Sequence, residues 1–233
     1  MTISYLQWDS SFFCLRIGKA EIYSVDDIEN LQSLELELKN QYDLIYIFNY
    51  INRKVDFATL VDVKVDYAKT IEPKEFNKHV QFYNNDSCTE QLYRLSLISG
   101  QYSRYNVDKK FPKGSYEALY RRWIEQSVCK NLADDVLVYI DESIECGMVT
   151  YRINIDYNTA RIGLVAVDEA IQGKGIGSSL VSSLENLLVR QGIDKLFVST
   201  QEDNIKACKW YEKNGFCVDS KVEIYHWWIN ENR

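Results

Sequence analysis

The spacing of hydrophobic and polar positions changes repeatedly along the second half of the chain. Runs in which apolar residues recur every three or four positions predict helices, and short apolar or alternating runs predict strands. The predicted elements are helices at 115–129, 178–190 and 205–214, and strands at 135–140, 145–155, 160–167, 195–200 and 222–229. Gly192 and Gly215 follow two of these helices, at the position where helices commonly end. This order of helices and strands indicates an α+β fold.

The first ninety residues carry a pattern of their own. The predicted elements are a helix at 26–40, capped by Asp26 or Asp27, and strands at 44–48 and 60–67. The second strand alternates strictly between apolar and polar residues, so one of its faces is expected in solvent. A polar connection at 72–90 leads to a further strand expected at 91–98. We therefore predict a small α/β domain at 1–90 and a larger α+β domain at 91–233.

Composition and charge narrow the classes of function. The formal net charge of −7 argues against nucleic-acid binding, because a phosphate backbone requires a basic face on the protein. No apolar run is long enough to span a membrane, and the opening residues carry no secretory pattern. The cysteines are scattered without a Cys-x-x-Cys pair, which is typical of reduced thiols in a cytoplasmic protein. With only two histidines in the chain, no metal site is expected.

A glycine-rich segment, Gln172–Ser178, joins the strand predicted at 160–167 to the helix predicted at 178–190. Such a turn presents several backbone N–H groups and the positive end of a helix dipole, which together bind anions. The glycines also let a bulky phosphate come close to the backbone. We therefore expect a phosphate group, such as a pyrophosphate, at this loop.

Two common phosphate-binding loops do not fit this segment. A Walker A loop requires lysine followed by serine or threonine, but Lys174 is followed by Gly175. A dinucleotide-binding fingerprint requires a third glycine at a place where this chain has Ser179-Leu180. The pattern Gln172-x-x-Gly175-x-Gly177 instead resembles the acyl-CoA pyrophosphate loop of the GCN5-related N-acetyltransferase (GNAT) superfamily.

A second segment strengthens this resemblance. The run Asn204–Phe216 is similar to the family's signature Asn-x-x-Ala-x-x-x-Tyr-x-x-x-Gly-Phe. Both signatures occur in the family's order, separated by one helix and one strand, and the resemblance covers roughly residues 91–233. It implies a GNAT fold, which is a mixed, mostly antiparallel sheet with flanking helices, preceded here by the smaller N-terminal domain.

The resemblance also implies that acetyl-CoA is the co-substrate. In the family, the strands before and after the glycine loop separate, and the thioester arm of acetyl-CoA lies in the gap. The residues implied to bind it are Val165, Ala166, Val167, Gln172, Gly173, Lys174, Gly175, Ile176, Gly177, Ser178 and Asn204. Lys174 is equally well explained as a solvated surface lysine, and Asn204 also suits a helix cap.

Tyr211 corresponds to the family's general acid, which protonates the CoA thiolate as it leaves. A tyrosine is protonated at neutral pH, as this role requires. The base that deprotonates the acceptor amine is not identified by the sequence. The candidates are Glu202, Asp203, Asp168 and His226, and a purely structural role suits His226 at least as well.

The opening Leu6–Phe13, and parts of the later sequence, resemble bacterial TDP-fucosamine (TDP-4-amino-4,6-dideoxyhexose) N-acetyltransferases. The resemblance implies a nucleotide-linked amino sugar as the acceptor. Trp8 is a candidate for stacking on the base, and Arg104 and Arg121 are candidates for pairing with the diphosphate. Core packing for Trp8 and ordinary surface charge for the arginines are the alternatives. The complete glycine loop departs from that group's degenerate loop, so the sugar and the nucleotide stay open.

The sequence therefore predicts a cytoplasmic, metal-free N-acetyltransferase that acts on the amine of a small molecule, a nucleotide-linked amino sugar. A homodimer is compatible with it, and the acyl group is open. The alternative acceptors are a peptide N-terminus, a polyamine or an aminoglycoside. A non-catalytic acyl-CoA-binding module is the alternative of a different class, although Tyr211 beside a complete loop argues against it.

Overall fold

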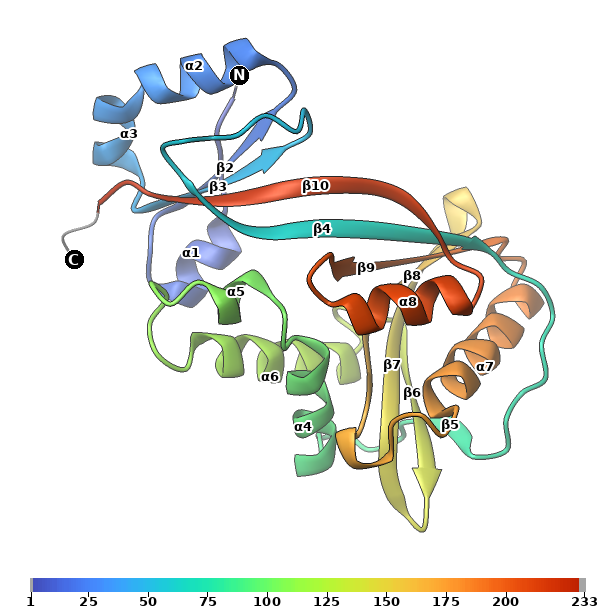
Figure 1. The fold of residues 1–233 in the computed structure, drawn as a ribbon. Coiled ribbons are helices and arrows are strands. Elements are labelled where there is room, and N and C mark those ends of the chain that lie inside the picture. The colour runs from blue at the N-terminus through green and yellow to red at the C-terminus, as the bar shows by residue number, and fades with distance from the viewer. Residues whose placement is uncertain (1, 231–233) are drawn as a thin grey trace.

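The computed structural model describes residues 2–230, which form one mixed sheet with helices on both faces (Figure 1). The helices are α1 (Gln7–Phe13), α2 (Val25–Ser33), α3 (Glu35–Gln41), α4 (Glu90–Ser99), α5 (Arg104–Val107), α6 (Ser115–Val128), α7 (Ile176–Arg190) and α8 (Ile205–Lys213). The strands are β1 (Ser4–Tyr5), β2 (Ile17–Ile22), β3 (Leu44–Asn49), β4 (Thr59–Thr70), β5 (Val80–Phe82), β6 (Asp135–Asp141), β7 (Ile144–Asn154), β8 (Thr159–Val167), β9 (Lys195–Gln201) and β10 (Cys217–Trp228). The predicted α+β class is confirmed.

The strand order of the sheet is β1-β2-β3-β10-β4-β9-β8-β7-β6-β5. The pairs β2–β3 and β8–β9 are parallel, and the other pairs are antiparallel. The long strands β4 and β10 run side by side through the middle of the molecule (Figure 1). Residues on both sides of position 90 thus contribute strands to a single sheet, and the division into domains 1–90 and 91–233 stays a prediction.

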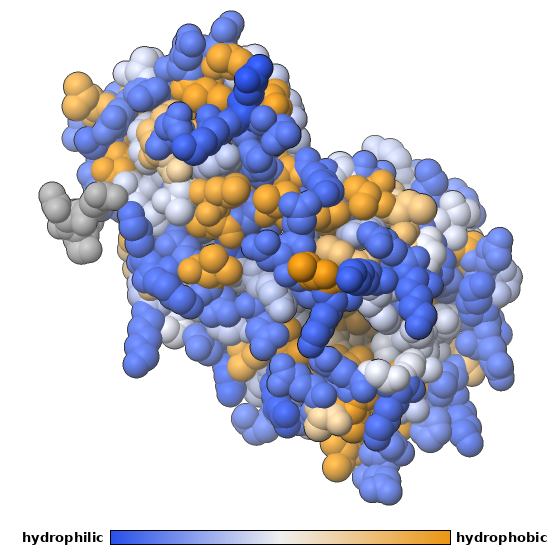
Figure 2. Space-filling view, in the orientation of Figure 1, coloured by the Kyte–Doolittle hydropathy of each residue, from blue (hydrophilic) through white to orange (hydrophobic). Residues whose placement is uncertain are grey.

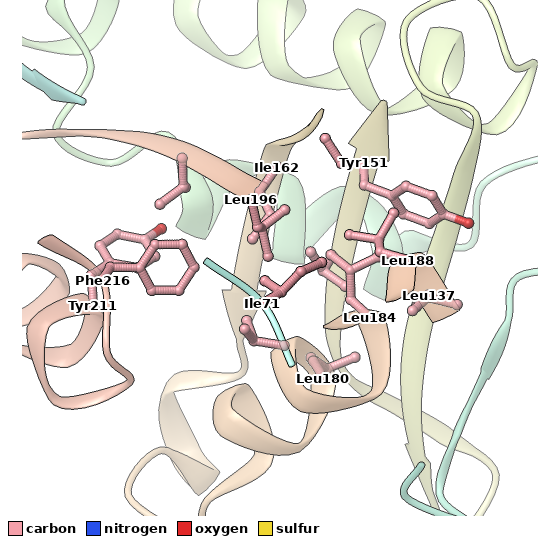
Figure 3. Close-up of a cluster of buried hydrophobic side chains, with 14 of the residues drawn as sticks. Ile71, Leu137, Tyr151, Ile162, Leu180, Leu184, Leu188, Leu196, Tyr211 and Phe216 are labelled. Carbon is pink, nitrogen blue, oxygen red and sulfur yellow. The ribbon is translucent and has the colours of Figure 1, made fainter. Parts of the chain in front are cut away.

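Two apolar cores cover opposite faces of the sheet. On one face, Leu180 and Leu184 of α7 pack with Tyr211 of α8 and with the strand residue Leu196 (Figure 3). On the other face, Phe13 of α1, Leu92 of α4 and Ile124 of α6 share a cluster with Tyr46 of β3 and Val138 of β6. Helices α2 and α3 bury Leu31 and Leu38 in a third cluster, with residues of β2, β3 and β10. None of the helices in residues 2–230 is long and apolar enough to cross a membrane.

The strand expected at 91–98 is wrong, because these residues form helix α4. The Thr89 hydroxyl accepts a hydrogen bond from the Leu92 N–H at 3.0 Å and caps the helix. Leu92 and Leu95 are fully buried at helical spacing. A run of only eight residues fits the apolar spacing of a helix and that of a strand equally well, and the cap at Thr89 favours the helix.

The predicted solvent-exposed face of the strand at 60–67 is also wrong. Asp62 and Asp66 are 7% and 9% exposed, because β4 is an inner strand covered on both faces. The helix expected at 26–40 is two helices, α2 and α3, which meet at Leu34. Its cap is Ser24, whose hydroxyl accepts from the Asp27 N–H, while the Asp27 carboxylate accepts from the Ser24 N–H.

Candidate active site

The parallel strands β8 and β9 separate toward their C-terminal ends. They pair only where residues 159–162 lie beside residues 195–198, although β8 continues to Val167 and β9 to Gln201. The backbone of residues 163–167 is therefore not paired with β9 on that side. The surface is hollowed beside α8, and apolar side chains line part of the hollow (Figure 2). This gap has the form that the resemblance implied for the thioester arm of acetyl-CoA.

The glycine loop lies at the end of β8 and leads directly into α7. Gly173 and Gly175 have φ angles of +83° and +81°, a left-handed conformation that glycine adopts without strain. The Ser179 N–H donates to the Gly175 carbonyl at 2.9 Å, so the N–H groups of residues 176–178 precede the first hydrogen bond of the helix. The Gln172 side chain donates to the Val167 carbonyl at 3.2 Å and ties the loop to the strand.

The loop also contacts helix α8. A Cβ atom on Gly177 would lie 3.0 Å from the Trp210 ring, so the absence of a side chain permits this approach. Trp210 precedes Tyr211, and the two rings have centroids 4.9 Å apart. The two sequence signatures that were recognised separately therefore come together in space.

Positive charge lies beside the loop despite the negative net charge. A surface hollow of about 550 Å³ is lined by residues 74–79 and by the first turns of α7, which Asn77 contacts through hydrogen bonds to Ser179 and Ser183. Lys74, Lys78 and His79 contribute to one wall, and Ser178 and Ser179 contribute to the other. Lys174 is exposed in the loop itself. The lysines place positive charge near the start of α7, which favours phosphate, although Glu75 also lines the hollow.

Asn204 and Tyr211 lie at opposite ends of α8. The Asn204 side chain accepts from the Ala207 N–H at 3.2 Å, which is the capping role. Tyr211 is 3% exposed, and its ring packs against Phe216 (Figure 3). The Tyr67 ring also packs on Tyr211, with the centroids 5.5 Å apart. Burial raises the pKa of Tyr211 above its ordinary value, and Cys208 and Tyr67 add to the rise, so the hydroxyl holds its proton throughout the neutral range.

On the other face of the sheet, Arg104 lies among aromatic rings. Its guanidinium is 4.5 Å from the Tyr105 ring centre and 5.2 Å from the Tyr46 ring centre, and it donates to the Tyr105 hydroxyl at 2.7 Å. The Tyr105 hydroxyl donates to Asp9 at 3.4 Å, which brings α1 against α5. Arg104 is therefore half-buried among these rings, with its Nε atom buried, rather than an ordinary surface charge.

Trp8 and Arg121 lie in different surroundings. Trp8 is 52% exposed and stacks on Phe12 with the ring planes 9° apart, so one broad apolar face is open. Arg121 lies against α4, where it is 4.5 Å from the Tyr93 ring centre and 3.5 Å from a Glu90 oxygen. Arg104 and Trp8 are connected through Asp9 and Tyr105, whereas Arg121 is engaged with α4.

The four candidate bases have different partners. Asp168 accepts from Gln91 and from the Ala170 N–H and pairs with Arg94, and these bonds lower its pKa. Glu202 is exposed and pairs with Lys221 at 2.5 Å, and Asp203 is exposed. His226 is buried with its Nδ1 2.6 Å from Asp108, and burial lowers its pKa.

A further carboxylate, Asp62, was missed by sequence reasoning. Burial raises the pKa of Asp62 to about 7, although Arg104 and Lys64 oppose the rise. Because Asp62 lies on the polar face of an alternating strand, the sequence predicted that its side chain would be exposed to solvent. The packing of α5 against that face buries it. Among residues 2–230, no three His, Cys, Asp or Glu side chains are grouped to hold a metal ion.

Residues 101–216 match the sequence model of the acetyltransferase (GNAT) family. The chain is 29% identical over 79 residues to the uncharacterized protein YxbD of Bacillus subtilis, which covers 34% of this chain and 47% of that protein. It is 23% identical over 141 residues to the spore coat polysaccharide biosynthesis protein SpsD of the same organism, covering 60% and 47%. It is also 24% identical over 151 residues to N-alpha-acetyltransferase 30 of Schizosaccharomyces pombe, covering 64% and 85%. The matches thus span about half the length of YxbD and SpsD.

Solved structures share the fold at low sequence identity. A functionally unknown conserved protein from Staphylococcus epidermidis superposes with a TM-score of 0.63 at 15% identity, covering 96% of this chain and 89% of that one. A GCN5-related N-acetyltransferase from Sphaerobacter thermophilus gives 0.54 at 13% identity, covering 89% and 68%. These likenesses support the GNAT fold.

Proposed function

Because the chain belongs to the acetyltransferase (GNAT) family, whose members are acetyl-CoA-dependent N-acetyltransferases, we propose that it acetylates the amine of a nucleotide-linked amino sugar of the TDP-4-amino-4,6-dideoxyhexose class. The observation that supports this acceptor is that exposed Trp8 is linked, through Asp9 and Tyr105, to half-buried Arg104 on the face of the sheet opposite to Tyr211. A flat apolar ring and a guanidinium suit a base and a diphosphate.

The gap between β8 and β9 supports the binding mode of acetyl-CoA. In this proposal, the pyrophosphate lies on the N–H groups of residues 173–178, with Lys174 as a neighbouring cation. The pantetheine arm lies along the unpaired backbone of Val165–Val167 and reaches Asn204. The adenosine end faces the cationic hollow beside α7.

Tyr211 is proposed as the acid for the leaving group. Attack of the amine on the thioester carbonyl gives a tetrahedral intermediate, and expulsion of CoA leaves a thiolate. A free thiol has a pKa of about 8.5, well below that of the buried Tyr211 hydroxyl. Complete transfer of this proton to a free thiolate is therefore uphill. The Tyr211 hydroxyl is proposed to stabilise the negative charge that develops on sulfur as the C–S bond breaks, and to pass its proton on as the amine proton replaces it.

Arg104 is the stronger of the two proposed diphosphate partners. Its Nε atom is buried and has no hydrogen-bond partner among the described residues, whereas Arg121 is already paired with Glu90. The relative SpsD is a spore coat polysaccharide biosynthesis protein, and an amino-sugar acceptor would be in keeping with such a process.

Acetylation of a peptide N-terminus is the second candidate. The relation to N-alpha-acetyltransferase 30 favours it, and that relative is matched over 85% of its length. A polyamine is disfavoured, because the Arg104 cation would repel a second positive charge on the acceptor.

The test is a panel assay that follows CoA release from acetyl-CoA. The acceptors are TDP-4-amino sugars, UDP-amino sugars, peptides with free N-termini, and polyamines. We expect the highest kcat/KM with a TDP-4-amino-4,6-dideoxyhexose and acetamide as the product linkage. Turnover confined to peptides or polyamines would reject the amino-sugar acceptor, and the family assignment would stand.

A further inference from the structure

One cluster of buried polar side chains lies on the α5 side of the sheet. Tyr46 of β3 and His226 of β10 are cross-strand partners, and their rings stack with centroids 4.9 Å apart. Asp62 of β4 is opposite Ile224 of β10, so it shares this face. Ser103 and Arg104, at the start of α5, complete the cluster, and Arg104 lies over Tyr46.

The polar atoms of this cluster are unusually short of partners. Seven buried side-chain nitrogen or oxygen atoms among the described residues have no hydrogen-bond partner, and five of them belong to this cluster. They are Tyr46 Oη, Asp62 Oδ1, Ser103 Oγ, Arg104 Nε and His226 Nε2. A buried polar group without a partner is destabilising, so five on one face indicate a ligand that satisfies them.

The five atoms differ in what they accept and donate. His226 Nδ1 lies 2.6 Å from the Asp108 carboxylate, which also accepts from the Trp228 N–H. A neutral His226 therefore donates from Nδ1, and its Nε2 is left as an acceptor. Asp62 Oδ1 is a second acceptor, Arg104 Nε is a donor, and the Tyr46 and Ser103 hydroxyls serve as either.

This combination of hydrogen-bond donors and acceptors fits a ligand that has an amine and neighbouring oxygen atoms. An ammonium group alone has only donors and leaves Arg104 Nε unsatisfied. The Arg104 charge beside the site also disfavours the ammonium form of the amine relative to the neutral form. A sugar ring with an amine next to hydroxyl groups meets both requirements.

The cluster lies close to the gap between β8 and β9. Lys64 is the β4 partner of Gln201, the last residue of β9, and the Glu202 N–H donates to the Val63 carbonyl at 2.8 Å. Asp62 is adjacent to this contact. The residue Tyr67, which packs on Tyr211, projects from the opposite face of β4. An acceptor on the Asp62 face and acetyl-CoA on the Tyr211 face would therefore meet where the strands separate.

We propose that this cluster is the acceptor-sugar subsite, in which Asp62 receives the proton of the amine, Tyr46 and Ser103 hold the adjoining sugar oxygens, and Arg104 remains the partner of the diphosphate. The assignment deepens the proposed function and rests on it. Asp62 Oδ1 takes one proton from the ammonium, and the freed lone pair forms the C–N bond with the thioester carbon. The C–S bond then breaks, and the thiolate takes the Tyr211 proton. The second proton of the amine then reaches the Tyr211 oxygen through solvent. The products are one amide and one thiol, and the proton taken by Asp62 is released.

The surroundings of Asp62 suit this task. Arg104 of α5 and Lys64 of β4 draw the carboxylate toward its charged form, while Asp203, after β9, works against it. Burial outweighs them, so the group changes charge close to neutral pH, where a general base is most effective.

The test compares Asp62→Asn with Asp66→Asn. Asp66 lies on the same strand and face and is similarly buried, but it is fully paired with Lys64, Arg161 and Ser199. We expect Asp62→Asn to lower kcat/KM with the acceptor from the panel by roughly 10²–10⁴-fold, to remove the limb of the pH profile near neutrality, and to leave acetyl-CoA affinity and Tm undiminished. Asp66→Asn should lower Tm and keep the pH profile.

Tyr46→Phe and Ser103→Ala extend the test to the oxygen-binding groups. Each should raise KM for the acceptor with little loss of stability, because among residues 2–230 neither hydroxyl makes a hydrogen bond of ordinary geometry, and each only lies beside another tyrosine, Tyr105 for Tyr46 and Tyr120 for Ser103.

The outcomes separate the two proposals. If the wild type acetylates none of the sugars, the proposed function fails. If it acetylates them and Asp62→Asn keeps its activity and pH profile, the subsite assignment is overturned. A measurement without acceptor also tests the assignment, because the ¹³C signal of the Asp62 carboxyl reports its pKa directly. An ordinary pKa for Asp62, together with a lowered Tm of Asp62→Asn, would show that Asp62 is a structural carboxylate.

Discussion

At the scale of single residues, two aspartates on β4 show how packing changes the meaning of one pattern. Asp62 and Asp66 look identical in the sequence, as polar positions of an alternating strand. Burial acts against the charged form of Asp66, but hydrogen bonds from Lys64, Ser199 and Arg161 outweigh it and lower its pKa. Asp62 has no comparable set, and its pKa is raised to about 7. Pattern alone cannot separate them, because their partners come from β9, β8 and α5.

Asp62 should make the protein less stable as pH rises. Between its unfolded pKa, near 3.8, and its folded value, about 7, the folded chain holds a proton that the unfolded chain has lost. The free energy of unfolding therefore falls across this window and then levels off. Asp62→Asn removes the effect, so the variant should gain on the wild type from about pH 4 upward, reaching on the order of 2–4 kcal/mol by pH 8.

Urea unfolding of both proteins between pH 4 and 8 measures this difference. Asp66→Asn serves as the control, because its folded-state pKa is lowered and its removal should cost stability above about pH 4. A constant difference between Asp62→Asn and the wild type at all pH values would contradict the raised pKa of Asp62.

Tyr211→Phe tests the proposed acid. The ring keeps its packing against Tyr67 and Phe216, so the fold and acetyl-CoA affinity should be retained. Loss of the hydroxyl proton should lower kcat by roughly 10²–10⁴-fold. Because burial raises the pKa of Tyr211, the wild type should show no loss of activity from ionisation of this group between pH 6 and 9. Steady-state kinetics of both proteins over that range test the role of Tyr211. A kcat of Tyr211→Phe near that of the wild type would show that another group donates the proton.

At the scale of elements, helices and strands with strong local patterns were predicted well from the sequence. The strand, loop and helix around Gln172 agree with β8 and α7 within a few residues, because glycines and a clear change of period mark them. The helix at α4 was missed, since eight residues of mixed period do not distinguish a helix from a strand. The burial of β4 was missed because strand order depends on pairing between distant segments.

Helix α7 offers a matched pair of glycines for testing the phosphate loop. Gly175 at its start and Gly192 beyond its end have φ angles of +81° and +78°, and neither would place a Cβ near another atom. Aspartate at either position should meet similar backbone strain, about 1–2 kcal/mol, while the helix dipole favours the carboxylate at Gly175 and disfavours it at Gly192. Only Gly175→Asp adds a negative charge where the pyrophosphate is proposed to lie, so it should weaken acetyl-CoA binding by at least about 10-fold.

Calorimetry with acetyl-CoA measures this contrast. Gly177→Asp is a poorer variant, because its side chain would meet Trp210 and disturb α8. Equal affinity of Gly175→Asp and Gly192→Asp for acetyl-CoA would place the pyrophosphate elsewhere.

At the scale of the whole molecule, the sheet brings the two halves of the sequence together. Strand β4 pairs with β9 on one side and with β10 on the other. The polar cluster therefore takes Tyr46 and Asp62 from the first ninety residues and Arg104 and His226 from the rest. The sequence predicted both halves from separate motifs, but it gave no indication that their strands interleave, because no local pattern records which strand pairs with which.

Because the two halves interleave, we predict that different residues bind the base and the sugar of the acceptor. Trp8 is proposed to stack on the nucleotide base, and the polar cluster is proposed to hold the sugar. Trp8→Ala should then raise KM for a TDP-linked amino sugar by about 5- to 10-fold, in keeping with the loss of about 1 kcal/mol of stacking, and leave KM for the free amino sugar unchanged. Tyr23→Ala is the matched control, since Tyr23 is a second exposed ring that stacks on a neighbour, Tyr50. Tyr23→Ala should leave both KM values unchanged. Measuring KM for the TDP-linked and the free amino sugar side by side tests this prediction. An equal rise in both KM values for Trp8→Ala would indicate that the ring supports the fold of α1 and does not bind the base.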